Sequence, residues 1–246
     1  MGDLTPPERL ERPGRPALAF RHRPGAGPTI LFLPGYASDM AGTKAVALDA
    51  WAARHGRAML RFDYAGCGDS AGRFEDETLA SWRDDALAMI DRTTGPLILV
   101  GSSMGGWIAL LAALARPERI AGLVGLAAAP DFTDWGYDAA DKARIIAEGR
   151  IARPSDYGAP LVTTRGFFEA GQKLRLLDSV IAIDCPVRLV QGQDDPDVPW
   201  QIALDLAARL RSSEVRTILV KNGDHRLSRP QDLSLIEATV AELTGD

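Results

Sequence analysis

Short apolar runs alternate along most of the chain with longer segments whose apolar residues recur at helical spacing. Runs of that length predict buried β-strands, and the segments between them predict helices that bury one face. Regular alternation of the two favours a mostly parallel sheet with helices on both faces. The expected strands are residues 29–33, 57–63, 97–102, 120–128, 186–191 and 215–220, with an edge strand near 17–21; the expected helices are residues 45–54, 76–92, 104–116, 200–211 and 231–243.

The alternation is interrupted between Pro130 and Ile183, where aromatic residues and two shorter helical patterns, at 138–148 and 165–177, replace it. The interruption begins at the carboxyl end of a predicted strand, which is where open α/β sheets bind their ligands. We therefore expect a small cap insertion over residues 131–183 within a single domain that spans residues 1–246. The alternative is a satellite packing element whose aromatic side chains fill only their own core.

The segment Gly101-Ser102-Ser103-Met104-Gly105 follows an apolar strand and precedes a helix rich in Ala and Leu. This is the G-x-S-x-G pattern of a nucleophile elbow, a sharp strand-to-helix turn that exposes a serine above the sheet. The serine of such a turn has a strained backbone, and side chains at Gly101 and Gly105 would crowd it. Ser103 is therefore the candidate nucleophile.

A second G-x-S-x-G pattern, Gly68-Asp69-Ser70-Ala71-Gly72, lacks this context. A polar, Gly-rich segment precedes Ser70, and the charged residues that follow begin no apolar helix at once. Because the elbow requires a strand before the serine and a helix after it, Ser103 is favoured over Ser70.

A serine hydroxyl becomes a good nucleophile when a histidine removes its proton. The chain has three histidines. His22 lies in the polar N-terminal segment, and His55 lies at the end of a predicted helix. Both are expected at the surface. His225 follows the last predicted strand, which is where the base belongs when the chain order is Ser, Asp, His. His225 is therefore the candidate base.

The carboxylate that orients the base belongs after the preceding strand, and this loop offers three. Asp195 is favoured because Asp195-x-x-Val198-Pro199 places it at the turn after Gly192. Asp194 is the main competitor and Asp197 the weaker one. The role of the carboxylate is to hold the histidine tautomer and stabilise the imidazolium without taking the proton itself.

An acyl-transfer site also needs N–H donors for the oxyanion of its tetrahedral intermediate. The Met104 backbone N–H, at the start of the elbow helix, is the first candidate. The second is expected from the loop after the first buried strand, Leu33-Pro34-Gly35-Tyr36, most simply the Tyr36 N–H. The alternative is that Pro34-Gly35 is an ordinary turn that ends the strand.

Composition narrows the class of protein. The net charge of −5 gives no electrostatic footprint for nucleic acid or an anionic membrane. Cys67 and Cys185 are too few for a disulfide framework, and no Cys/His cluster suggests a metal site. Residues 1–23 lack the apolar core of a signal peptide, and no apolar run reaches the length of a membrane span. We expect a cytoplasmic protein with no metal, cofactor, nucleic-acid partner or membrane span; its oligomeric state stays open.

Several segments together resemble the α/β-hydrolase family over essentially the whole chain: Leu33–Tyr36, residues 61–70, the Ser103 elbow, Asp195-x-x-Val-Pro and Gly223-Asp224-His225. Within that family the chain is most similar to the abhydrolase branch of the palmitoyl-protein thioesterase and mycophenolic acid acyl-glucuronide esterase type, through residues 38–45, 185–189, 195–200 and 224–226. The resemblance implies the α/β-hydrolase fold, a Ser103–Asp195–His225 triad and a structural loop around Ser70. Many members have His where this chain has Pro34.

The expected activity is that of a cofactor-independent serine hydrolase, which cleaves a carboxylic ester or thioester of a small-molecule or acylated substrate through an acyl-enzyme. Met40, Trp135, Phe167 and Trp200 are candidate apolar walls of the substrate pocket, with packing in the core as the alternative. Two other functions stay open: hydrolysis of a carbon–carbon bond on the same triad, and a non-catalytic binding protein with the hydrolase fold.

Overall fold

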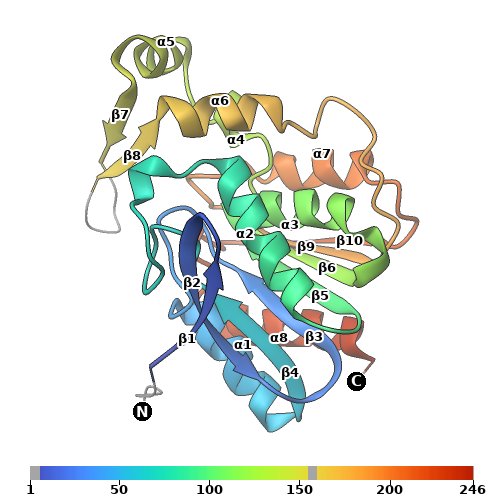
Figure 1. Cartoon of the computed structure of the whole chain (residues 1–246). Coiled ribbons are helices and arrows are strands. Elements are labelled where there is room, and N and C mark those ends of the chain that lie inside the picture. The colour runs from blue at the N-terminus through green and yellow to red at the C-terminus, as the bar shows by residue number, and fades with distance from the viewer. Residues whose placement is uncertain (1–5, 155–159, 246) are drawn as a thin grey trace.

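The computed structural model describes residues 6–154 and 160–245, and a large sheet runs through its centre (Figure 1). In these residues the sheet has eight strands, in the order β1-β2-β4-β3-β5-β6-β9-β10. The β1–β2 and β2–β4 pairs are antiparallel, and the other neighbours are parallel. The strands are β1 (Glu8–Arg12), β2 (Arg15–Arg23), β3 (Ala26–Leu33), β4 (Arg57–Phe62), β5 (Leu97–Ser102), β6 (Ile120–Leu126), β9 (Val187–Gly192) and β10 (Val215–Val220).

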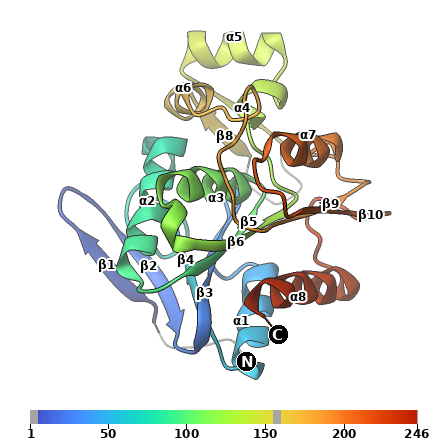
Figure 2. The ribbon, with the colours of Figure 1, turned by 90° about the vertical axis from the view of Figure 1, so that its right-hand side faces the viewer.

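Helices cover both faces of the sheet, as Figure 2 shows in a view along its edge. One face carries α1 (Thr43–Arg54) and α8 (Pro230–Thr244), and the other carries α2 (Leu79–Arg92), α3 (Met104–Ala115) and α7 (Gln201–Arg209). Single turns of 3₁₀ helix span Phe74–Asp76 and Pro117–Arg119. This arrangement confirms the predicted mostly parallel sheet between two layers of helices.

The central strands are buried on both sides, because successive side chains of a strand point to opposite faces. In β3, Leu31 and Leu33 pack into the core under α2 and α3, whereas Ile30 and Phe32 pack into the core over α1 and α8. The two cores explain why the strands read as continuous apolar runs in the sequence. They make the sheet a rigid platform for the loops at the carboxyl ends of its strands.

The segment between β6 and β9 lies beyond the sheet, next to α2, α3 and α7 (Figures 1 and 2). It contains α4 (Phe132–Trp135), α5 (Ala139–Glu148), the antiparallel pair β7 (Arg150–Arg153) and β8 (Leu161–Thr164), and α6 (Arg165–Lys173). These elements occupy the stretch of chain for which the sequence predicts a cap insertion, residues 131–183, and the role of a cap stays a prediction. Residues 155–159 of the prediction lie outside the described residues.

Most predicted boundaries differ from the structure by a few residues, and two of the differences have a clear local reason. The helix predicted from residue 76 begins at Leu79, because Thr78 and Ser81 form reciprocal capping hydrogen bonds there. The strand predicted to residue 128 ends at Leu126, since Ala127 turns the chain with a φ of 45°. The helix predicted to residue 177 ends at Lys173. The sequence pattern also missed β1, β7 and β8, which are short.

The elbow glycines lead to a stability prediction. A Cβ added at Gly105 would lie 2.1 Å from the carbonyl oxygen of Leu33, a rigid backbone atom, whereas one at Gly166 in α6 meets only a Thr78 methyl group at 3.6 Å. We expect Gly105→Ala to lose about 3 kcal/mol or more of unfolding free energy, in the range of overpacked cores. Gly166→Ala, the matched control, keeps or gains stability because Ala favours the helix. Denaturant unfolding of both variants measures the difference. Equal midpoints for Gly105→Ala and Gly166→Ala would contradict the predicted loss of stability at Gly105.

Candidate active site

Ser103 lies at the turn between β5 and α3, with φ of 53° and ψ of −120°. A positive φ combined with this ψ is a strained conformation for a serine. Hydrogen bonds hold the turn: the Ser103 N–H donates to Leu126 at 2.9 Å, and the Ser103 carbonyl accepts from Ala129 at 3.1 Å. A Cβ at Gly101 would lie 2.3 Å from the Gly105 carbonyl oxygen. The predicted steric need for both elbow glycines is confirmed.

His225 connects the serine to a carboxylate. Its Nε2 lies 3.1 Å from the Ser103 hydroxyl oxygen, and its Nδ1 lies 2.8 Å from Asp195 Oδ2. An ionised Asp195 accepts hydrogen bonds but donates none, so Nδ1 carries the hydrogen of that contact. The tautomer with hydrogen on Nδ1 leaves the lone pair of Nε2 facing the serine hydroxyl. The structure thus brings together the three residues that the sequence predicted as a triad.

Asp195 is held as an anion. Its side chain is fully buried; Oδ2 also accepts from Gln191 Nε2 at 2.9 Å, and Oδ1 accepts from the N–H groups of Asp197 and Val198. Burial raises the pKa of Asp195, but the hydrogen bond and charge of His225, together with those two N–H groups, lower it below its ordinary value. The carboxylate is therefore ionised at neutral pH.

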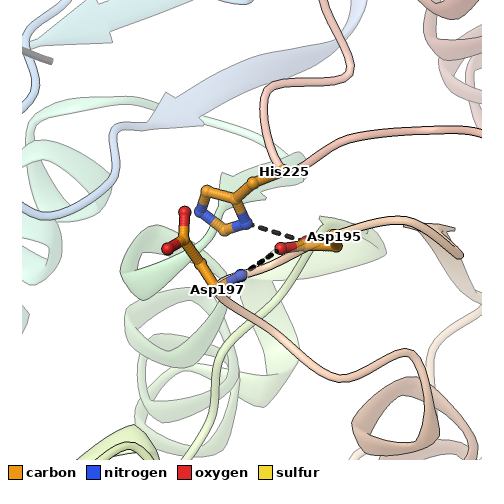
Figure 3. Close-up of side chains that lie close together, drawn as sticks. All are labelled: Asp195, Asp197 and His225. Atoms are coloured by element: carbon orange, nitrogen blue, oxygen red, sulfur yellow. Dashed lines mark hydrogen bonds and ion pairs between the residues drawn. The ribbon is translucent and has the colours of Figure 1, made fainter. Parts of the chain in front are cut away.

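The two competing carboxylates occupy different places. Asp194 is exposed, and its N–H donates to the Gly223 carbonyl at 3.0 Å, which holds the Asp195 loop against the His225 loop. Asp197 is also exposed, and its carboxylate lies beside the imidazole of His225 (Figure 3). Asp195, Asp197 and His225 place one polar atom each within 4.8 Å of one another. The hydrogen bonds of Asp195 and His225 account for this cluster, and we assign no metal to it.

The remaining candidates from the sequence are structural. Ser70 donates from its hydroxyl to the Asp63 carbonyl at 2.6 Å and accepts from the Ala19 N–H at 2.8 Å, so it ties the loop after β4 to β2. His22 and His55 are exposed, and His55 stacks on Trp51. Neither histidine lies at the carboxyl edge of the sheet, where Ser103 is.

The predicted oxyanion loop lies against the nucleophile. A Cβ at Gly35 would be 3.4 Å from Ser103 Cβ, so this glycine lets the loop approach closely. Next to it, Tyr36 donates from its phenol to the Val162 carbonyl at 2.5 Å, and its ring packs edge-on against Phe74 and Trp82. Burial raises the pKa of Tyr36, so the phenol stays neutral. These contacts hold the side chain of Tyr36 in place, and the backbone N–H of the same residue is the candidate oxyanion donor.

A cavity of about 600 Å³ opens above Ser103 and His225. Its volume is typical of cavities that bind small molecules. One wall is apolar and comes mainly from the segment between β6 and β9, and the other is polar and comes from the loop before α1 and from the His225 loop. The apolar wall includes Tyr36, Phe132, Trp135, Tyr137, Pro154 and Leu161; the polar wall includes Ser38, Asp39, Thr43, Lys44, Arg226 and Ser228.

Of the predicted wall residues, Trp135 lines this cavity and the other three do not. Met40 is buried where its N–H donates to Asp63 and its carbonyl accepts from Arg61. Phe167 is buried against Tyr36 and Trp82. Trp200 is the N-cap of α7 and half-buried outside the cavity lining. For Met40 and Phe167 the alternative holds, because both side chains are buried in the interior, whereas half-buried Trp200 belongs neither to the cavity lining nor to the buried core.

Two charged residues of the cavity, Lys44 and Arg153, were not predicted. Lys44 lies in the first turn of α1, and its Nζ donates to the carbonyl of Arg226, which is 182 positions away in the chain. Arg153 ends β7, and its guanidinium lies 4.3 Å from the centre of the Tyr137 ring. Lys44 lies in the segment 38–45 that carries the family resemblance, but this segment assigned it no role, and no pattern marks Arg153; both reach the cavity through tertiary contacts.

Comparisons with known proteins agree with this geometry. The model of the serine aminopeptidase S33 family matches residues 26–147. Human palmitoyl-protein thioesterase ABHD10, a mitochondrial protein, is 40% identical over 240 residues, which cover 95% of this chain and 78% of that protein. The structure of mouse α/β hydrolase domain-containing protein 10 matches with a TM-score of 0.91 at 39% identity, over 97% of this chain and 98% of that one.

A structure described as a putative hydrolase from Agrobacterium vitis S4 is similar to the same extent, with a TM-score of 0.90 at 38% identity over 98% of this chain and 100% of that one. Fold, elbow and comparisons define a serine hydrolase of the α/β-hydrolase superfamily that acts on esters or thioesters. Within that superfamily, the chain belongs to the ABHD10 family. In its described residues, the chain contains no helix of sufficient length and hydrophobicity to span a membrane.

Proposed function

We propose that this chain hydrolyses acyl thioesters and carboxylic esters through an acyl-enzyme on Ser103, with His225 as base and Asp195 as the residue that orients it. The observation that carries this proposal is the unbroken chain of contacts from Asp195 Oδ2 through both ring nitrogens of His225 to the Ser103 hydroxyl. The chain ends inside a cavity large enough for an acyl group.

In the first half-reaction, the Ser103 oxygen attacks the acyl carbon while His225 Nε2 takes the hydroxyl proton. The negative charge that develops on the acyl oxygen is stabilised by the backbone N–H groups of Met104 and Tyr36; a donor of this kind is worth about 3 kcal/mol. The N–H of Met104 suits this role because the first N–H groups of a helix have no partner within it. Collapse of the intermediate expels the thiol or alcohol, which receives the proton from His225.

In the second half-reaction, a water molecule takes the place of the leaving group. His225 removes a proton from this water, which attacks the acyl carbon of the Ser103 ester. The intermediate then releases the carboxylic acid, and Ser103 recovers its proton from His225. Asp195 stabilises the imidazolium in both steps and remains ionised.

We propose that the apolar wall of the cavity binds the acyl group of the substrate. We also propose that the segment 131–183 is a cap that contributes this wall. Phe132, Trp135, Tyr137 and Leu161 of this segment line the cavity. The printed names of the mammalian relatives, palmitoyl-protein thioesterase, support a long acyl chain and a thioester bond. Those names also place the relatives in mitochondria, whereas a cytoplasmic location for this chain stays a prediction from its composition.

The test is turnover of matched thioesters and oxygen esters that differ only in acyl length. We expect hydrolysis of both bonds, an optimum of kcat/KM at a long acyl chain, and loss of activity after treatment with a serine-directed phosphonate. Wild-type protein that takes up the phosphonate on Ser103 but hydrolyses no ester or thioester would contradict the proposed substrates. Failure of the phosphonate to label Ser103 would contradict the mechanism itself.

A further inference from the structure

We propose that Lys44 is a positioning residue for His225: its side chain holds the loop that carries the base against the start of α1. The inference rests on the proposed role of His225 and adds a residue to that site. Lys44 Nζ donates to the carbonyl oxygen of Arg226 at 2.5 Å. Arg226 directly follows His225, so this hydrogen bond acts one peptide away from the imidazole.

The loop needs such an outside contact because its backbone is strained. Asn222 and Leu227, on either side of His225, have positive φ values of 58° and 45°. Asn tolerates a positive φ, but in a leucine such a conformation persists only where surrounding contacts impose it. Within the loop, the Leu227 N–H donates to Asp224 Oδ1, and the Ser228 hydroxyl donates to the same Arg226 carbonyl that accepts from Lys44. Lys44 adds the link from the loop to α1.

This link joins two loops of the proposed active site. The chain leaves β3 through the oxyanion loop at Gly35 and Tyr36, passes Ser38 and Asp39, and enters α1 at Thr43. Lys44 therefore follows the oxyanion loop closely in the chain, and in the polar wall of the cavity it contacts the loop that carries the base. Because a reacting geometry that is about 1 Å out of place costs on the order of 100-fold in rate, a contact that holds these two loops together has a direct effect on catalysis.

The position of Lys44 is unfavourable for a lysine in two respects. A cation in the first turn of a helix opposes the positive end of the helix dipole. Burial is the main cause that lowers the pKa of Lys44 to about 8, and the positive charge of Arg226 lowers it further. The carboxylates of Asp224, Asp195 and Asp232 raise this pKa but do not offset the effect of burial. The titratable His225 lies in the same loop. Both effects disfavour the charged form of Lys44. A lysine at such a position is consistent with a role for the hydrogen bond to the Arg226 carbonyl.

A pH dependence follows from that pKa. Below about pH 8 the ammonium form carries the full charge that strengthens the bond to the Arg226 carbonyl, and this charge is lost as pH rises through 8. The contribution of Lys44 to the rate is therefore largest at neutral pH and falls at alkaline pH, where the neutral amine donates a weaker hydrogen bond. A residue that merely filled space would give a contribution that does not depend on pH.

The experiment measures how fast a fluorophosphonate labels Ser103 between pH 6 and 10 in wild type, Lys44→Met and Lys44→Arg. Met keeps most of the volume without the charge, and Arg keeps the charge at all these pH values. We expect wild type to label about tenfold faster than Lys44→Met at pH 7, with the ratio falling toward one above pH 9. We expect Lys44→Arg to label at about the wild-type rate at neutral pH. Above pH 9 we still expect Lys44→Arg to label faster than Lys44→Met. Lys221→Met, an exposed lysine of the same loop, is the matched control and labels like wild type.

Turnover separates positioning from substrate binding, because Lys44 also lines the cavity. With a neutral acyl thioester we expect Lys44→Met to lower kcat about tenfold and to leave KM within about twofold. A change confined to KM, a labelling ratio of one at pH 7, or a ratio that is the same at every pH would overturn the inference. Labelling needs no substrate, so the two labelling outcomes remain decisive even if the protein hydrolyses neither thioesters nor esters.

Discussion

The Ser103→Ala variant should lose about 10⁵-fold in kcat for acyl thioesters and fall to the residual rate that oxyanion donors and binding alone provide. The reason is that no acyl-enzyme can form without the hydroxyl oxygen. Ala fits the elbow as well as Ser does, since the hydroxyl makes its contact with His225 and the turn is held by backbone hydrogen bonds. Stability should therefore stay near that of wild type.

Ser70→Ala is the matched control for Ser103→Ala, because Ser70 is the serine of the other G-x-S-x-G pattern. Loss of its hydroxyl removes hydrogen bonds to Asp63 and Ala19, which should cost about 1 kcal/mol or more of stability. We expect kcat to stay within about twofold of wild type in this variant. Steady-state kinetics and denaturant unfolding of both variants measure the two effects. Equal losses of kcat in the two variants would contradict the assignment of the nucleophile.

The Asp195→Asn variant should lose about 10⁴-fold in kcat while the fold is retained. An amide at this position can donate a hydrogen to Nδ1, which favours the tautomer with hydrogen on Nε2. That hydrogen then points at the Ser103 hydroxyl, and the base can no longer accept a proton. KM should change little, because Asp195 lies behind the imidazole and its side chain is fully buried.

Asp194→Asn and Asp197→Asn are the matched controls for Asp195→Asn. Asp194 contacts the His225 loop through its backbone, which the substitution leaves unchanged. Asp197 faces the imidazole from the solvent side, so removal of its charge should change kcat by only a few-fold, about the effect of an exposed charge pair. A loss for Asp197→Asn as large as that for Asp195→Asn would show that the wrong carboxylate has been assigned.

The parts of the site that depend on local backbone geometry were predictable from sequence. Gly101 and Gly105 mark the elbow because the turn leaves no room for a side chain. The positions of Asp195 and His225 follow from the order of the strands, since parallel strands bring the loops after their carboxyl ends to one edge of the sheet. Chain order and turn chemistry therefore identify residues that lie far apart in the sequence.

The walls of the cavity were not predictable in the same way. Phe167 and Trp135 both lie in the insertion, yet one is buried in the core and the other lines the cavity. The hydrophobicity of a side chain does not distinguish these outcomes, which depend on how α4, α6 and the β7–β8 pair pack together. Lys44 was missed for a related reason: its partner, the Arg226 carbonyl, is a backbone atom that no motif marks.

The most direct test of the central claim is to trap the acyl-enzyme. Wild-type protein is mixed with a long-chain acyl thioester and quenched in acid at short times, and its peptides are analysed by mass spectrometry. We predict one acyl group per chain on the peptide that contains Ser103, and none on Ser103→Ala. An acyl group on Cys67 or Cys185 that forms and decays at the rate of turnover, with none on Ser103, or turnover by Ser103→Ala at the wild-type rate, would contradict the account.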